Sequence, residues 1–283
     1  MVKIATDSCC DLTVELLKEN NIAVLPLLVS LGEDDYFDGV NVSPDDIYEF
    51  VKNTKQLPKT AARSTEDFKE FFSNLLEDGS EVVYTGIGSN LSCTYENAKR
   101  AKEELGSDRL FVVDSKSLST GIGLLVLFAS NLAKQGKNGE QIVDQMKKQA
   151  ENSQASFVVN KLDYLHKGGR CSAMAKFGAN LLKIKPRLEL VDGKIENTGK
   201  YMGQFKSVLL KYVDDMLNAH PNPKKDICFV THTKTEKEIV DAVIEHIKSK
   251  NIFDRIVETT AGSTITCHCG ENTLGMLFLT EME

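Results

Sequence analysis

Three segments of the sequence are rich in side chains that can donate hydrogen bonds to a polar ligand. They read TDSCCD from Thr6, GSNLSCTY from Gly88 and DSKSLSTGIG from Asp114, and each follows a short apolar run. Taken singly, each segment is typical of a helix cap, because Ser, Thr, Asp and Asn are the preferred residues there. If the three runs are strands of one parallel sheet, the segments meet at its carboxyl edge, where ligands of such sheets bind. Together they predict a rim of donors that needs a polar ligand or water.

A basic side chain follows two glycines in the segment LDYLHKGGRCS, which begins at Leu162. The glycines allow a tight turn that presents the guanidinium of Arg170 to its surroundings. A guanidinium held in this way suits a carboxylate or a phosphate. An interdomain salt bridge is the alternative role for the same residue.

The glycine pairs do not predict a nucleotide site. The stretches at 86–88 and 121–123 both read GIG, but Leu91 and Val126 occupy the positions where a dinucleotide fingerprint has its third glycine. The GxxxxGK[ST] loop of ATP-binding proteins is also missing.

Metal and nucleophile chemistry have partial signals near the C-terminus. Cys267, His268 and Cys269 are ligand types, but no CxxC pair accompanies them. In the strand expected here, the two cysteines would share one face and His268 would take the other, so we predict no metal site. Ser92 could pair with His268 as a nucleophile, but it lacks the flanking glycines of G-x-S-x-G.

The sequence predicts that the candidate site residues are carried by two parts of the chain with different folds. Up to residue 153, apolar runs alternate with amphipathic helical patterns, which predicts an α/β fold with a mostly parallel sheet and helices on both faces. The rest reads as α+β, with a hairpin turning at Asp192-Gly193 and with two or three strands at the C-terminus. We therefore predict two closely packed domains, 1–153 and 154–283, with a ligand cleft between them.

The bulk composition excludes several classes of protein. The chain of 283 residues carries a net charge of −7, which argues against a nucleic-acid partner. No apolar run reaches the ~18 residues of a membrane span, and the N-terminus has no signal-peptide pattern. The seven cysteines form no regular framework, so we expect reduced thiols and a cytoplasmic location.

Five motifs in order make the whole chain resemble the DegV family of fatty-acid-binding proteins. TDSCCDL is similar to the family's TDS-x-x-DL, LSCTYENA to LSGTY-x-x-A, and DSKSLSTGIGLLV to D-S-x-x-x-S-x-G-x-G. LDYLHKGGRCS is similar to LxxLxKGGRIS, and the stretch from His268 to Gly270 to the late H-x-G. The resemblance implies a two-domain α/β protein that buries a long-chain fatty acid, expected to be C14–C18, between its domains.

The resemblance also implies roles for particular residues. Ser92 would hold the carboxylate, helped by the loop from Thr60 to Ser64, which stands where the family has T-S-Q-P-S. Arg170 and His268 would lie near the head group or on the surface that faces a kinase. Ser92 would then be the ligand donor at its junction, while Ser89 or Asn90 caps the following helix.

The chain departs from the family at the proposed site. Ala61 replaces the second hydroxyl of the T-S-Q-P-S loop, which removes one carboxylate donor. Cys93 replaces the glycine of LSGTY and adds bulk near the head group. The late motif continues with Glu271 and Asn272 where Pro-Gly is usual, and GKYMGQFKS lacks the arginines common there.

Two functions remain in competition. The first is a carrier that sequesters the fatty acid and presents its carboxylate to a separate ATP-dependent fatty acid kinase, with no cofactor and no chemistry of its own. The second is an acyl hydrolase or transferase that uses Ser92 or Cys93 with His268.

Overall fold

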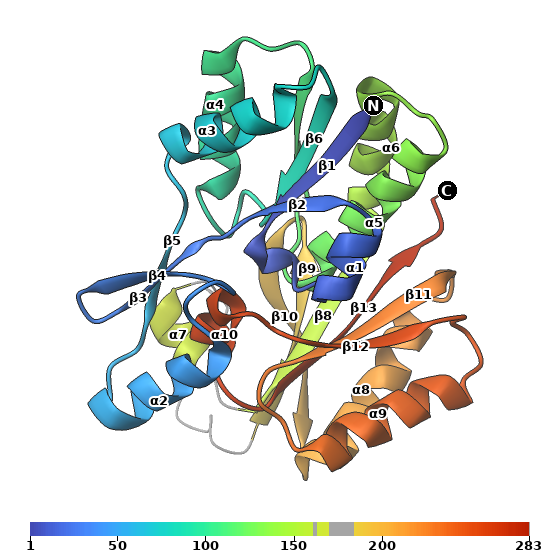
Figure 1. Cartoon of the computed structure of the whole chain (residues 1–283). Helices are drawn as coiled ribbons and strands as arrows, with labels where there is room; N and C mark the ends of the chain where they lie inside the picture. Colours follow the sequence, from blue (N-terminus) through green and yellow to red (C-terminus); the bar gives the residue numbers. More distant parts are fainter. Residues whose placement is uncertain (161–162, 170–183, 283) are drawn as a thin grey trace.

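The computed structural model describes residues 1–160, 163–169 and 184–282. Its first half is built on a parallel sheet of strand order β2-β1-β6-β7 (Figure 1). The elements of this half are β1 Val2–Asp7, the 3-10 turn η1 Ser8–Cys10, α1 Val14–Glu19, β2 Ile22–Leu25, β3 Leu28–Leu31, β4 Asp34–Phe37, α2 Pro44–Thr54, β5 Lys59–Ala61, α3 Thr65–Leu76, β6 Glu81–Gly86, α4 Thr94–Leu105, β7 Leu110–Asp114, α5 Thr120–Lys134 and α6 Gly139–Ala150.

Alternation along the strands explains why helices cover both faces of this sheet. Val82 and Tyr84 of β6 pack in one buried cluster with α3 and α4, whereas Val83 between them packs in the cluster that contains α5 and α6. The predicted doubly covered parallel sheet is therefore confirmed. Ser43 caps α2, with Pro44 as its first residue, and Ser64 caps α3.

The second half forms a mixed sheet of strand order β10-β9-β8-β13-β11-β12. Helices α8 and α9 cover one of its faces, and α5 packs between its other face and the parallel sheet (Figure 1). The elements are β8 Ser153–Val159, α7 Asp163–Gly168, β9 Ile184–Val191, β10 Lys194–Met202, α8 Phe205–Ala219, β11 Pro223–His232, α9 Lys237–Ser249, β12 Ile256–Thr260, α10 Ser263–Cys269 and β13 Thr273–Thr280.

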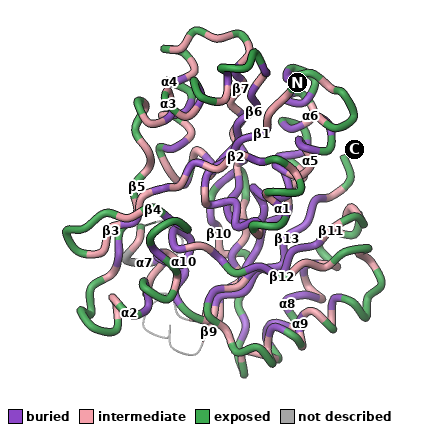
Figure 2. The backbone as a smooth tube through the Cα atoms, in the orientation of Figure 1, coloured by how far each residue is buried: buried purple, intermediate pink, exposed green. Residues whose placement is uncertain are grey.

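The core is continuous between the two sheets. Phe157 of β8 and Ile122 of α5 belong to the same buried cluster as Ile4 of β1, and Figure 2 shows the buried backbone running through the centre of the molecule. The change from one sheet to the other falls at Ser153, next to the predicted boundary. The division into domains 1–153 and 154–283 stays a prediction.

Several local predictions are wrong or incomplete. The apolar run IAVLPLLVSLG has the pattern of a single strand, but it is split at Pro26 into β2 and β3, and β3 joins a small sheet of order β4-β3-β5. The C-terminal stretch expected to hold only strands contains α10, and part of the expected turn before Gly169 is helix α7. The hairpin turn is confirmed, since Asp192 and Gly193 have φ of 49° and 74°. The predicted helix SAMAKFGANLL lies outside the described residues.

Candidate functional site

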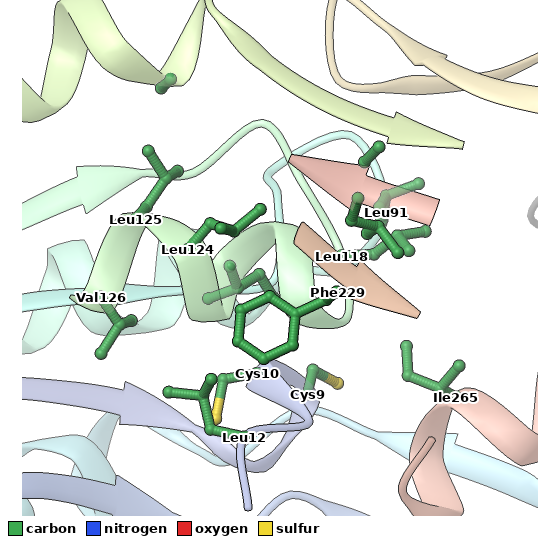
Figure 3. Packing of buried hydrophobic residues seen from close by; sticks show 14 of the residues in the cluster. Cys9, Cys10, Leu12, Leu91, Leu118, Leu124, Leu125, Val126, Phe229 and Ile265 are labelled. Atoms are coloured by element: carbon green, nitrogen blue, oxygen red, sulfur yellow. The ribbon is translucent and has the colours of Figure 1, made fainter. Parts of the chain in front are cut away.

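A mostly apolar cavity of about 350 Å³ lies where the parallel sheet, the mixed sheet and the small sheet meet. Its volume falls within the ~300–1,000 Å³ typical of small-molecule sites. Three of the residues that line it, Leu91, Leu118 and Ile265, are labelled in Figure 3. The lining residues are Leu27, Thr60, Ala61, Ala62, Ile87, Leu91, Ser92, Cys93, Asn97, Leu118, Phe157, Leu165, Ile195, Thr264, Ile265, His268 and Cys269.

The hydroxyls expected at the site do line this cavity. Thr60 Oγ1 of β5 and His268 Nε2 of α10 are 2.8 Å apart and share a hydrogen bond. Ser92 lies just before α4, where its Oγ is 2.8 Å from Thr94 Oγ1 and accepts a hydrogen bond from the Thr94 N–H. The structure thus brings Thr60, Ser92 and His268 to one cavity from positions up to 208 residues apart.

The polar side chains gather at the end of the cavity that reaches the surface. Ala61 and Cys93 are both exposed, and they are neighbours of Thr60 and Ser92 in the chain. Asn97, one turn into α4, donates to the main-chain oxygen of Arg63 at 2.8 Å and so ties α4 to the segment after β5. We call this end, formed by residues 60–62, 92–93, Asn97 and His268, the mouth of the cavity.

The opposite end is buried and apolar. Leu118, Phe157, Ile265 and Cys269 line the main cavity and also a second cavity of about 30 Å³ beyond it. All four side chains belong to the central buried cluster. The site is therefore a pocket with a polar entrance and an apolar floor.

The predicted cap of α4 is wrong. Ser89 Oγ donates to Asp114 Oδ2 at 2.5 Å, and Asn90 Nδ2 donates to the main-chain oxygen of Asp192 at 2.9 Å. The helix begins only at Thr94, because the chain first makes a turn through Gly88, whose oxygen accepts from the N–H groups of residues 91 and 92. Ser92 is therefore both a local partner of the helix start and a hydroxyl that lines the mouth of the cavity.

The other two hydroxyl-rich segments turn their side chains inward. Ser8 donates to Asp38, Ser119 donates to Asp11, and Asp7 accepts from the N–H groups of Cys9 and Ile87. Burial raises the pKa of Asp7 to about 6 and that of Asp11 to about 8. Of the three segments, only the one at Ser92 therefore brings a hydroxyl to the main cavity, whereas the hydroxyls of Ser8 and Ser119 bond carboxylates within the protein.

The alternative chemistries find little support in the described residues. Within residues 1–160, 163–169 and 184–282, no group of three or more His, Cys, Asp or Glu side chains could hold a metal ion. Cys267 and Cys269 lie in helix α10 instead of the expected strand, and burial raises their pKa values. His268 Nε2 bonds Thr60 Oγ1, whereas the Ser92 hydroxyl bonds Thr94 Oγ1.

Some functional residues were missed by the sequence analysis, and one could not be placed. Asn97 had a usable signal, because it lies four residues after Cys93 on the same face of a helix. Thr264 and Ile265 had none, because the stretch was interpreted as strand. Arg170 lies outside the described residues, and its role stays a prediction. Among the described helices, none is long and apolar enough to cross a bilayer.

Comparisons with known proteins agree with this fold. A sequence profile described as "Uncharacterised protein, DegV family" matches residues 1–281. A DegV domain-containing protein of Clostridium perfringens is 30% identical over 280 residues, which cover 99% of each chain.

Solved structures of similar proteins superpose over nearly the full length. A DegV family protein of Thermus thermophilus, described by its fatty acid binding, has a TM-score of 0.92 at 26% identity, covering 99% of both chains. A stearic acid-binding protein of Eubacterium ventriosum has a TM-score of 0.85 at 27% identity, covering 99% of this chain and 98% of that one. This chain therefore belongs to the DegV family.

Proposed function

We propose that this protein is a cytoplasmic carrier that binds a long-chain fatty acid in the cavity, with the carboxylate at the mouth and the acyl chain on the apolar floor. The observation that carries the proposal is the polarity of the pocket, with hydroxyl and imidazole groups at the exposed end and Leu, Ile and Phe side chains at the buried end. An acid with a long alkyl tail has the same polarity. The fatty-acid-binding relatives in Thermus thermophilus and Eubacterium ventriosum support this assignment.

The size of the cavity supports a chain of this class. An apolar cavity of ~150 Å³ can hold benzene, which corresponds to roughly 25 Å³ per carbon. On that scale the main cavity of about 350 Å³ has room for about 14 carbons. This matches the lower end of the proposed C14–C18 range, and longer acids would extend toward the second cavity. Burial of about 12 methylenes at ~0.8 kcal/mol each contributes roughly 10 kcal/mol before the cost of ordering the chain.

The mouth offers the partners that a buried carboxylate needs. Without hydrogen bonds, burial of the charge would cost several kcal/mol. Ser92 and Thr60 each carry a hydroxyl at the mouth, and His268 supplies a ring nitrogen beside Thr60. Ala61 offers none, so this site has one side-chain donor fewer than a loop with two hydroxyls.

The same geometry supports presentation of the carboxylate to a partner kinase. The head group would lie beside Ala61 and Cys93, which are exposed, so a second protein could reach it without opening the apolar floor. The transfer of phosphate would be carried out by the ATP-dependent partner, and this chain would hold the acid during it. Arg170 is proposed to face that partner.

Mass spectrometry of the purified protein tests the proposal against the hydrolase or transferase alternative. The protein is measured under native conditions, then extracted with solvent under denaturing conditions, and both fractions are analysed. We expect one free C14–C18 acid per chain and an unmodified polypeptide after extraction. A polypeptide that keeps an acyl mass on Ser92 or Cys93 would support the enzyme instead. A protein that neither carries nor takes up a C14–C18 acid would overturn the carrier.

A further inference from the structure

Two buried carboxylates from the first half of the chain hold the beginning of helix α10. Asp11 Oδ1 accepts from the Gly262 N–H at 2.9 Å. Asp38 accepts from the next two amides, with Oδ1 2.8 Å from the Ser263 nitrogen and Oδ2 3.2 Å from the Thr264 nitrogen. Three successive amides at this helix start therefore donate to side chains more than two hundred residues away.

These carboxylates are themselves fixed by hydroxyls of the segments that were expected to face a ligand. Ser119 donates to the second oxygen of Asp11 at 2.5 Å, and Ser8 donates to Asp38 Oδ2 at 3.0 Å. Ser8 Oγ also accepts from the N–H of Leu27, which lines the cavity. Both acids are buried, so water does not compete for their bonds.

Helix α10 depends on this support because its own sequence provides little. It has seven residues, and its N-cap is Gly262, which has no side chain to accept from the first amides. Short helices are unstable without tertiary contacts, and the amides at a helix start favour a negative partner. The side chains of Asp11 and Asp38 supply the acceptors.

The position of α10 decides the shape of the mouth. The helix contributes Thr264, Ile265, His268 and Cys269 to the cavity wall, and His268 bonds Thr60 across the mouth. Thr264, whose amide is held by Asp38, lies one helical turn before His268 on the same face. A shift of the helix start would therefore be carried directly to the imidazole.

We propose that Asp11 and Asp38 are positioning residues, which fix α10 so that His268 meets Thr60 at the mouth of the cavity. This inference rests on the proposed function for its effect on fatty acid binding. It assigns the TDSCCD segment to holding the walls of the cavity and not to contact with the ligand.

The test combines a spectroscopic signature with an affinity. The ¹⁵N shift of His268 Nε2 is measured in delipidated protein, and the Kd of a fluorescent long-chain fatty acid is measured separately. Thr60→Val gives the Nε2 shift that results when the bond to Thr60 is lost. Asn138→Ala removes the capping box of α6, far from the mouth, and serves as a control for loss of stability alone.

We expect Asp38→Ala to move the Nε2 shift toward its value in Thr60→Val and to weaken fatty acid binding at least tenfold. Asp38→Asn keeps one acceptor but turns an amide group toward the Thr264 N–H, so a two- to fivefold loss and a smaller shift are expected. The control should change neither quantity.

Wild-type values of both the Nε2 shift and the Kd in Asp38→Asn would overturn the proposal, and this holds even if Asp38→Ala does not fold. An equal change in the α6 control would also overturn it, because the effect would then follow stability in general. If the wild-type protein binds no fatty acid, the proposed function fails, and the Nε2 shift alone decides the positioning role.

Discussion

Replacement of Ser92 by Ala tests the head-group site most directly. The Ser92 hydroxyl lies in the cavity wall at the mouth, where it bonds Thr94 Oγ1 at 2.8 Å and accepts from the Thr94 N–H at 3.2 Å. The substitution removes a donor to the carboxylate and also a partner of the buried Thr94 hydroxyl. It should therefore lower both affinity and stability, for separable reasons.

The two effects have different expected sizes. A hydrogen bond to a charged group contributes about 1.5–3 kcal/mol, so loss of the bond from Ser92 should weaken acid binding by roughly 10- to 150-fold. Loss of the contacts with Thr94 should lower the free energy of unfolding by about 1–2 kcal/mol. Acid binding is measured under conditions in which the wild-type protein and the variant are both fully folded, so the loss of stability does not change the measured affinity.

The assay compares a long-chain acid with the alcohol of the same length, in the wild-type protein and in Ser92→Ala. The alcohol fills the same apolar floor but carries no charge, so its affinity should change less than that of the acid. Ser89→Ala is the matched control, since this hydroxyl is three residues away and bonds Asp114. We expect the control to lose stability and to keep the wild-type preference for the acid.

An unchanged ratio of acid to alcohol affinity in Ser92→Ala would refute the assignment of the carboxylate to this hydroxyl. If both affinities fall by the same factor, the ratio is also unchanged, and the substitution would then act on the shape of the apolar wall. Loss of the acid preference in Ser89→Ala would show that the whole turn before α4 had moved.

Three further predictions use other parts of the structure. Gly168→Ala places a Cβ 2.7 Å from His268 Nδ1, so we expect a several-fold weaker fatty acid affinity, and wild-type affinity by fluorescence titration would contradict it. Burial raises the folded pKa of Asp7 to about 6 and of Asp11 to about 8, both above the usual 3.8. The stability from their protonated forms is present below about pH 4 and is lost as the pH rises through 6 and 8, so Asp11→Asn should flatten the upper part of this decline in urea unfolding. Arg170→Ala should leave acid affinity unchanged and slow phosphate transfer by the kinase; a normal transfer rate would exclude its proposed role.

Much of the first half could be predicted because its signals are local. The helices α2 and α3 are capped by Ser43 and Ser64, each with an acidic residue three positions later that completes a capping box. The strands of the parallel sheet are short apolar runs between such helices. Pro26 was the signal that IAVLPLLVSLG would divide, because proline cannot donate to a ladder of hydrogen bonds.

The site was only partly predictable, since its residues come from three distant segments. The family motifs pointed to Ser92, Thr60 and His268, and all three line one cavity in the structure. The bond between Thr60 and His268 joins positions 208 residues apart, and no spacing rule in the sequence predicts such a pair. The order of the motifs predicted a role for these residues, and the structure showed which of them are in contact.

Helix α10 shows why local sequence rules could not predict how the histidine at the mouth is positioned. Its sequence, STITCHC, is rich in β-branched residues, so propensity favoured a strand, and the glycine before it has no side chain to cap a helix. The acceptors that satisfy its first amides are Asp11 and Asp38, in the other half of the chain. A strand at this place would leave the side-chain oxygens of Asp11 and Asp38 buried without the amides of residues 262–264, and burial of polar groups without hydrogen bonds is costly. The carboxylates and the helix therefore require each other, and the histidine at the mouth of the cavity is placed by a pairing that forms only when both halves fold together.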